Sequence, residues 1–260
     1  MLLKLFVAFG IAAFLVYRIA GGRLKWKSPQ QDFPEDWRKT LRQKVNYYEQ
    51  LNKKQQKLFE YKVQEFLLNC TITGVETEVS QTDRLLIAAS AVIPIFAFPE
   101  WKYKNLDEVL LYPRMFSEDF ATKGEGRNIL GMVGNGYMER KMILSKQALH
   151  QGFQNETDKR NTAIHEFIHL IDKMDGEVDG IPKVLLEKQY VIPWVDMIEQ
   201  KIEEIVARKS DIHPYAKTSR IEFFAVLGEY FFERPHLLKR KHPDLYQILE
   251  EIFDQDLAGE

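Results

Sequence analysis

The sequence predicts an α+β fold in which a helical majority lies beside a small β-sheet. Apolar residues recur at helical spacing through the first third of the chain and again from residue 162 almost to the C-terminus. Between these two regions, short apolar and β-branched runs indicate strands. No internal repeat or low-complexity segment interrupts this order, so the pattern is that of a globular domain.

Length and composition limit the classes of protein to consider. The chain has 260 residues, 45% of them hydrophobic, which suffices for one substantial core. We expect one domain at residues 35–260, preceded by a polar, proline-bearing linker at residues 23–34. The formal net charge of -2 gives no general attraction for nucleic acid, so nucleic acid is not an expected partner. The single cysteine, Cys70, excludes an intramolecular disulfide.

The N-terminal segment, residues 1–22, is strongly apolar. Its uninterrupted apolar run, Leu5–Tyr17, is flanked by Lys4 and Arg18, which can snorkel to the two surfaces of a bilayer. The segment predicts a transmembrane anchor, and a secretory signal is the alternative because small residues lie near its end. More basic residues follow the segment than precede it. By the positive-inside rule we therefore expect a membrane-anchored protein whose domain lies in the cytoplasm.

In the first third of the domain, the sequence pattern predicts three helices and one strand. Apolar residues of the first helix recur every three or four positions: Trp37, Leu41, Val45 and Tyr48. The second helix begins after Asn52, and Gln55 three residues later completes a capping-box pattern. The run "TITGVETEV", residues 71–79, is rich in β-branched residues and predicts a strand. "SQTD", residues 80–83, predicts the start of a third helix, which Pro94 should end or kink.

The middle of the chain predicts the rest of the sheet. "EVLLYP", residues 108–113, reads as a buried strand. Residues 129–145, "ILGMVGNGYMERKMILS", predict two strands joined by a tight hairpin turn at Asn135 and Gly136. The remaining pattern is helical and predicts four helices, which start at Thr162, span Pro193 to about Lys209, and run through residues 219–234 and 243–255.

The segment "NTAIHEFIHLID", residues 161–172, contains the HExxH motif. On a helix, His165 and His169 project from the same face, so their two imidazoles can bind one metal ion. Glu166 lies beside them, where it can take a proton from a metal-bound water. A chance match in such a chain arises on the order of one time in a hundred. The alternative is that both histidines are ordinary helix residues paired with carboxylates.

A catalytic zinc site needs a third protein ligand. No further histidine follows the motif at short spacing, so a distant carboxylate is required. Glu222 interrupts an apolar helix between Ile221 and Phe223, an unfavourable place for a charge unless it is paired or binds a cation. It is the best candidate. Glu229, seven residues later, is a candidate hydrogen-bond acceptor for a ligand histidine, and a surface or core-pairing carboxylate is the alternative.

Further residues could complete the site. The hydroxyl of Tyr215 could donate to an oxyanion, or the side chain could simply be buried at a helix entry. Asp172 faces the same way as His165 and His169 and could orient an imidazole, or it could have only a packing role. His213 is a weaker candidate. The other histidines have no partner pattern and are predicted at the surface: His150, His236 and His242.

"HEFIHLID" followed by "EFFAVLGEYFF" resembles the Mlc titration factor A family of zinc-dependent metallopeptidases. This family belongs to the gluzincin group and is similar to the protease domain of anthrax lethal factor. The resemblance extends from about residue 52 to residue 256 and implies a zincin-like domain with one Zn²⁺ per chain. It implies that His165, His169 and Glu222 are zinc ligands, that Glu166 is the general base, and that Tyr215 donates a hydrogen bond to the transition state. The apolar N-terminal segment is a departure from the soluble family pattern.

These observations lead to three hypotheses of function. The first is a zinc-dependent peptidase that cleaves a peptide or protein substrate, which lies extended along "KMILS", residues 141–145, as an exposed sheet edge. The second is a membrane-tethered binding protein with little or no peptidase activity. Its partner would be a transcriptional regulator, which the resemblance implies. The third is a metal-dependent hydrolase that acts on a non-peptide substrate.

Overall fold

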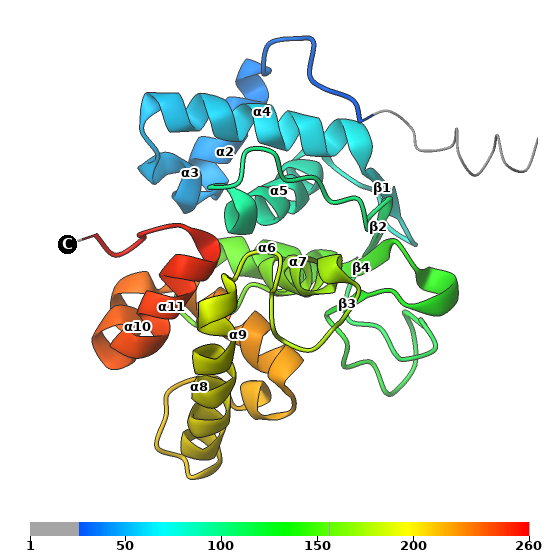
Figure 1. Ribbon diagram of the computed structural model, residues 1–260. Helices are drawn as coiled ribbons and strands as arrows, with labels where there is room; N and C mark the ends of the chain where they lie inside the picture. Colours follow the sequence, from blue (N-terminus) through cyan, green and yellow to red (C-terminus); the bar gives the residue numbers. More distant parts are fainter. Residues whose placement is uncertain (1–25, 156, 260) are drawn as a thin grey trace, which may run out of the picture.

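The structure, a computed structural model, describes residues 26–155 and 157–259 (Figure 1). It confirms the α+β class, with one small sheet lying beside a helical majority (Figure 1). The α-helices in chain order are α2 (Glu35–Lys44), α3 (Asn46–Gln50), α4 (Lys53–Asn69), α5 (Gln81–Val92), α6 (Lys146–Gln154), α7 (Thr162–Asp172), α8 (Lys188–Val206), α9 (Arg220–Glu233), α10 (Pro235–Lys241) and α11 (Pro243–Phe253). The strands are β1 (Thr71–Gly74), β2 (Glu108–Tyr112), β3 (Gly131–Val133) and β4 (Lys141–Ser145).

The N-terminal helices begin where their caps predict. Asn52 caps α4 together with Gln55, and Ser80 caps α5 together with Asp83, so both capping boxes are confirmed. The predicted first helix is instead split into α2 and α3, because Val45 adopts an extended backbone (φ -122°, ψ 92°). Its apolar face was nevertheless assigned correctly, since the last three of the four predicted positions are fully buried.

The sheet has the strand order β1-β2-β4-β3. The strands β1, β2 and β4 run parallel, and β3 pairs with β4 in antiparallel orientation. The predicted antiparallel pair is confirmed, but the prediction of a tight turn at Asn135 and Gly136 is wrong. A longer connection joins the strands, containing the 3-10 turn η2 (Gly136–Met138) and closed by a hydrogen bond from the Gly134 N–H to the Lys141 carbonyl.

The edge of the sheet differs from the prediction. "KMILS" is β4, and β4 lies between β2 and β3. Its backbone is therefore paired on both sides and cannot take up an extended peptide. In the described part of the chain, β3 is the strand at this edge. It lies beside α7, which carries the HExxH motif (Figure 1).

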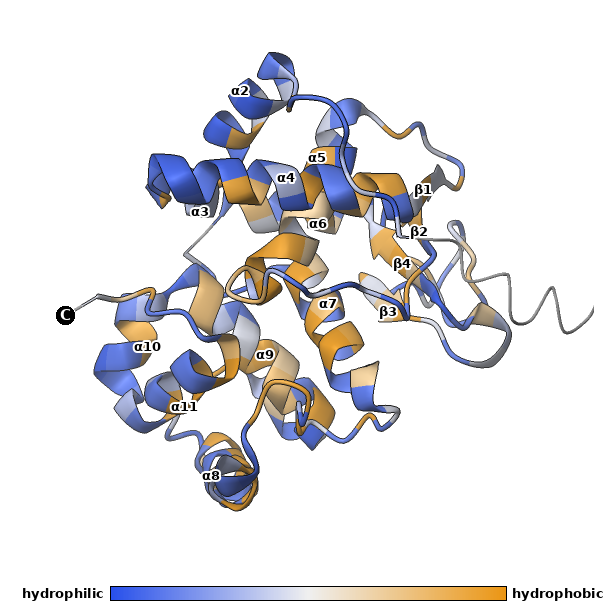
Figure 2. Cartoon of the chain, turned by 45° about the horizontal axis from the view of Figure 1, so that its top comes forward, coloured by the Kyte–Doolittle hydropathy of each residue, from blue (hydrophilic) through white to orange (hydrophobic). Residues whose placement is uncertain are grey.

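The two faces of the sheet are covered differently. One face packs into the main core with the helices, through Ile72, Val109, Leu111, Met142 and Leu144. The other face is covered by the segment that follows β2, where Tyr112, Phe116 and Ile143 form a smaller cluster. The helix α7 lies in the main core and is apolar over most of its length (Figure 2). The core thus holds α7 firmly between the sheet and α9.

The predicted membrane location is wrong for the part of the chain that the structure describes. No helix within residues 26–155 and 157–259 is long and apolar enough to cross a membrane. The longest of these helices, α8, has 19 residues, but charged residues such as Asp196, Glu199 and Lys201 interrupt it. The predicted anchor, residues 1–22, lies outside the described residues.

Candidate metal centre

The helix α7 places the two histidines of the motif on one face. Its N-cap is Asn161, whose side chain accepts a hydrogen bond from the Ile164 N–H at 3.2 Å. One turn separates His165 from His169, and their Nε2 atoms lie 3.0 Å apart. Both imidazoles thus present the same ring nitrogen to one point.

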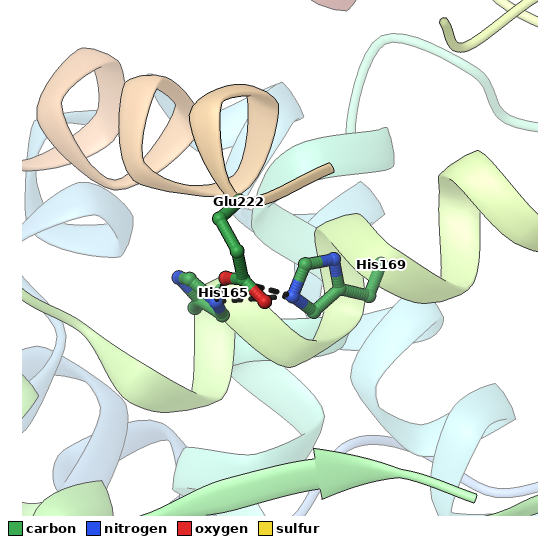
Figure 3. Close-up of side chains that lie close together, drawn as sticks. All are labelled: His165, His169 and Glu222. Carbon is green, nitrogen blue, oxygen red and sulfur yellow. Dashed lines mark hydrogen bonds and ion pairs between the residues drawn. The ribbon is translucent and has the colours of Figure 1, made fainter. Parts of the chain in front are cut away.

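Glu222 reaches this point from α9 (Figure 3). Ser219 caps α9 by accepting the Glu222 N–H, so Glu222 lies in the first turn of the helix. Its Oε2 atom is 3.0 Å from Nε2 of His165 and 3.5 Å from Nε2 of His169. Burial would raise the pKa of Glu222, but the two imidazoles outweigh it and hold the pKa well below its usual range.

The three donor atoms fit a metal ion. They all lie within 4.8 Å of one another. A tetrahedral zinc ion with bonds of about 2.0–2.2 Å has ligand atoms separated by about 3.3–3.6 Å. Two imidazole nitrogens and one carboxylate oxygen are also ligand types that zinc accepts in catalytic sites. The side chains present therefore fit the ion that the sequence predicts.

Glu229 orients His165. Nδ1 of His165 donates to Oε1 of Glu229 at 2.7 Å, and the other oxygen of Glu229 accepts the Asn161 N–H at 2.6 Å. Glu229 is 7% exposed, which excludes the surface alternative. A hydrogen bond at Nδ1 leaves Nε2 of His165 free to face the metal position. The prediction from sequence did not include Asn161, although an asparagine directly before a helix is a recognisable N-cap signal.

Glu166 lies on another side of α7, against β3. It is 5% exposed, and no hydrogen bond to its carboxyl group is present among the described residues. Burial raises the pKa of Glu166, and the two nearby histidines counteract only part of that effect. A raised pKa brings a carboxyl group closer to the range in which it can accept and return protons near neutral pH.

Tyr215 lies beside the three candidate ligands. It belongs to the 3-10 turn η4 (Pro214–Lys217), and its ring centroid is 6.1 Å from that of His165. The side chain is 47% exposed, so it is not the buried tyrosine of the alternative. Partial burial and its interaction with the Glu222 carboxylate raise the pKa of Tyr215 to about 12. The hydroxyl therefore keeps its proton at neutral pH and can donate it in a hydrogen bond.

Sequence spacing left open what Asp172 and His213 contact, and the structure shows the partners of both. The fully buried Asp172 accepts the Gly180 N–H at 3.0 Å, so it fixes the loop after α7, and burial raises its pKa to about 6. Within the described residues it makes no hydrogen bond to His169, whose buried Nδ1 has no partner there. His213 caps η4 by accepting the Tyr215 N–H and also contacts Arg160.

The remaining histidines lie away from this centre. His236 is exposed, as predicted. His150 is only partly exposed and bonds to Asp83 at 2.6 Å. His242 is buried and bonds to Asp211 at 2.8 Å, so its predicted surface position is wrong.

Comparisons with known proteins found a matching family model and several relatives. A family model described as glucose-regulated metallo-peptidase M90 matches residues 22–254. "Uncharacterized protein slr2042" of Synechocystis sp. is 28% identical over 244 residues, which cover 88% of each chain. Mlc titration factor A of Pectobacterium atrosepticum is 30% identical over 186 residues, covering 65% of this chain and 67% of the relative.

Another relative spans nearly the whole protein. Mlc titration factor A of Escherichia fergusonii is 28% identical over 258 residues, which cover 90% of this chain and 92% of the relative. These similarities confirm the resemblance that the motifs predict, and a metallopeptidase family implies a bound metal. The chain belongs to the glucose-regulated metallo-peptidase M90 family.

Proposed function

We propose that this protein is a zinc-dependent peptidase whose catalytic domain comprises residues 35–260. One observation carries the proposal: the donor atoms of His165, His169 and Glu222 converge from α7 and α9, directly beside the buried Glu166. Three protein ligands and a neighbouring carboxyl group are the parts that metal-assisted hydrolysis of a peptide bond requires. When bound, zinc lowers the pKa of a water molecule and polarises a carbonyl oxygen.

The protein side chains then have separate roles. Glu166 takes the proton from the attacking water and later gives it to the leaving amine. Tyr215 donates a hydrogen bond from its hydroxyl to the oxyanion that develops on the carbonyl oxygen. Glu229 holds the imidazole of His165 in one orientation through Nδ1. Charge develops only during the reaction, so the Tyr215 contact strengthens in the transition state.

The substrate position follows from the sheet. We propose that an extended peptide adds to β3, the edge strand beside α7, by backbone hydrogen bonds. This replaces β4, which the sequence alone favoured and which is paired on both sides. A peptide in this place passes next to Glu166, because β3 and the Glu166 side chain are in contact.

The experiment that tests the function compares wild type with Glu166→Gln on a mixed peptide library. Glutamine keeps the size of the side chain but cannot accept the proton, so we expect kcat to fall by about 10²–10⁴-fold. Zinc content, measured by mass spectrometry of the metal, should stay equal to that of wild type. Equal cleavage by both proteins would refute the mechanism. Matched ester and amide substrates tested side by side distinguish a peptidase from a hydrolase of non-peptide substrates.

The names of the relatives favour a second candidate function. Several are called Mlc titration factor A, a name that refers to titration and not to cleavage. A binding protein of this kind would sequester a regulatory partner and need no proton-accepting carboxyl group. If Glu166→Gln binds such a partner as wild type does and neither protein cleaves any peptide, this second function is supported.

A further inference from the structure

We propose that Gly131 on β3 is a positioning residue, and that the space left by its missing side chain sets where the Glu166 carboxyl group lies. The geometric part of this inference concerns only the contact between β3 and α7. Its consequence for catalysis rests on the proposed peptidase function. Neither the motif nor the family comparison assigns a role to this glycine.

The contact leaves no room for a side chain. A Cβ atom built on Gly131 would lie 2.6 Å from both Cγ and Oε1 of Glu166 and 2.9 Å from its Cδ. Ordinary van der Waals contacts of a Cβ atom lie between 3.4 and 4 Å. Any residue other than glycine therefore forces the end of the Glu166 side chain to move.

The backbone gives no other reason for glycine at this position. Gly131 does not have a positive φ angle, so its conformation is open to every residue type. It pairs with Leu144 as the first of three consecutive antiparallel pairs between β3 and β4. In such a strand glycine is unfavourable, because it loses more backbone entropy than other residues and contributes no packing. The close approach to Glu166 is the feature that requires it.

The position of Glu166 depends on its packing contacts. Its carboxyl group has no hydrogen bond among residues 26–155 and 157–259. The histidine next to it is held very differently, by a 2.7 Å bond to Glu229. A buried side chain without hydrogen bonds takes its position from the groups packed against it. For Glu166, the backbone of β3 at Gly131 is one of these groups.

The geometric claim is tested by a double-mutant cycle on stability. The full-length protein with zinc is unfolded in urea as wild type, Gly131→Ala, Glu166→Ala and the double variant. With Glu166 present, alanine at position 131 should lower the urea midpoint, because the end of the Glu166 side chain is buried and has to move within a packed interior. With Glu166→Ala the collision is gone, and alanine should raise the midpoint because it suits a strand better than glycine. This reversal of sign identifies the contact.

The catalytic claim is tested on the same variants. We expect Gly131→Ala to lower kcat by roughly 100-fold, the effect of misplacing a catalytic group by about 1 Å, while KM changes little. Zinc content should equal that of wild type, because the three atoms nearest to a Cβ at Gly131 all belong to Glu166 and none to a candidate ligand. If wild type itself cleaves no peptide, the proposed function fails, and the stability cycle still decides on Gly131.

Gly228 on α9 supplies the matched control. A Cβ atom there would lie 2.0 Å from Cδ1 of Ile168, a different side chain of the same helix. Gly228→Ala should therefore destabilise by the same amount with and without Glu166→Ala. If Gly131→Ala shifts the midpoint equally in both backgrounds, or if Gly228→Ala couples to Glu166 as strongly as Gly131→Ala does, the inference is overturned.

Discussion

The helix α7, which carries the candidate site, meets two neighbours, and these hold the side chains of α7 by different means. On the α9 side, charged and polar groups bind one another directly, with Glu222 near both histidines and Glu229 between His165 and the helix N-terminus. On the β3 side, Glu166 is positioned by packing against Gly131. The proposed metal ligands thus depend on directional contacts, and the proposed base depends on shape. Substitutions on the α9 side should therefore lower metal affinity, whereas substitutions on the β3 side should lower kcat and leave metal binding unchanged.

The largest effect is expected on the α9 side, from Glu222→Ala. This change removes one of the three candidate ligands and leaves the Nε2 atoms of His165 and His169 without the carboxylate oxygen that faces them. We expect zinc affinity and peptidase activity to fall together, on the order of 10³-fold or more. Competition with a zinc chelator measures the affinity. The control is Glu199→Ala, which removes an exposed carboxylate on α8. Unchanged zinc binding by Glu222→Ala would show that the third ligand lies elsewhere.

Tyr215→Phe should give the next largest effect. It removes the hydroxyl group but leaves the ring beside His165. We expect kcat to fall by about 10²-fold with KM and zinc content nearly constant, because the hydrogen bond forms chiefly in the transition state. Steady-state kinetics measure both constants. Tyr137→Phe, at a side chain that is 82% exposed, is the matched control. A fall in zinc content instead of kcat would assign Tyr215 a structural role.

Glu229→Gln tests the directional contact behind a ligand. His165 and the Asn161 N–H donate to different oxygens of Glu229, and in glutamine one of these oxygens is replaced by an NH2 donor, so one of the two donors loses its acceptor. We expect zinc affinity to fall by about 10–100-fold. Glu233→Gln is the control, since Glu233 also accepts from Asn161, through its side-chain amide, and is not one of the three candidate ligands. Equal losses in both variants would trace the effect to Asn161.

The smallest effect concerns Asp211, two residues before the cap of η4. Burial would raise its pKa, but bonds from Lys159, His242 and Tyr230 outweigh burial and hold the pKa well below its usual range. A lowered pKa stabilises the fold above the unfolded-state value of about 3.9, and this stability is lost as pH falls below it. Allowing for partial exposure, Asp211→Asn should cost about 1–2 kcal/mol at pH 7 and less at pH 3.

Urea unfolding at both pH values measures this difference, with Asp196→Asn on the exposed face of α8 as the control. If the stability cost of Asp211→Asn does not change with pH, the charge of Asp211 does not contribute to the stability of the fold. A cost that shrinks on acidification would show that charge contacts support the segment leading to Tyr215.

The convergence of His165, His169 and Glu222 could be predicted from the sequence because its signals are local. His165, Glu166 and His169 have a fixed spacing on one helix, and helix geometry alone puts the histidines on one face. Glu222 was conspicuous as a charge within an apolar run. The face of the first helix, the capping boxes and the strands were also read from short patterns, although the break at Val45 was not.

The β3 side could not be predicted in the same way. Its key contact depends on strand order, and β4 inserts between β2 and β3, which neighbouring sequence does not indicate. The sequence therefore does not indicate that Gly131 contacts Glu166 of α7. The role of Asp172 was open for a similar reason, because its partner Gly180 is set by the path of a loop.

The central claim is that α7 and α9 together bind one zinc ion. Anomalous diffraction at the zinc absorption edge, on crystals of the full-length protein, tests it most directly. We expect one peak per chain, about 2.0–2.2 Å from Nε2 of His165, Nε2 of His169 and a carboxylate oxygen of Glu222. A zinc peak that is bound by other residues, or that lies beyond the reach of Glu222, would contradict the claim.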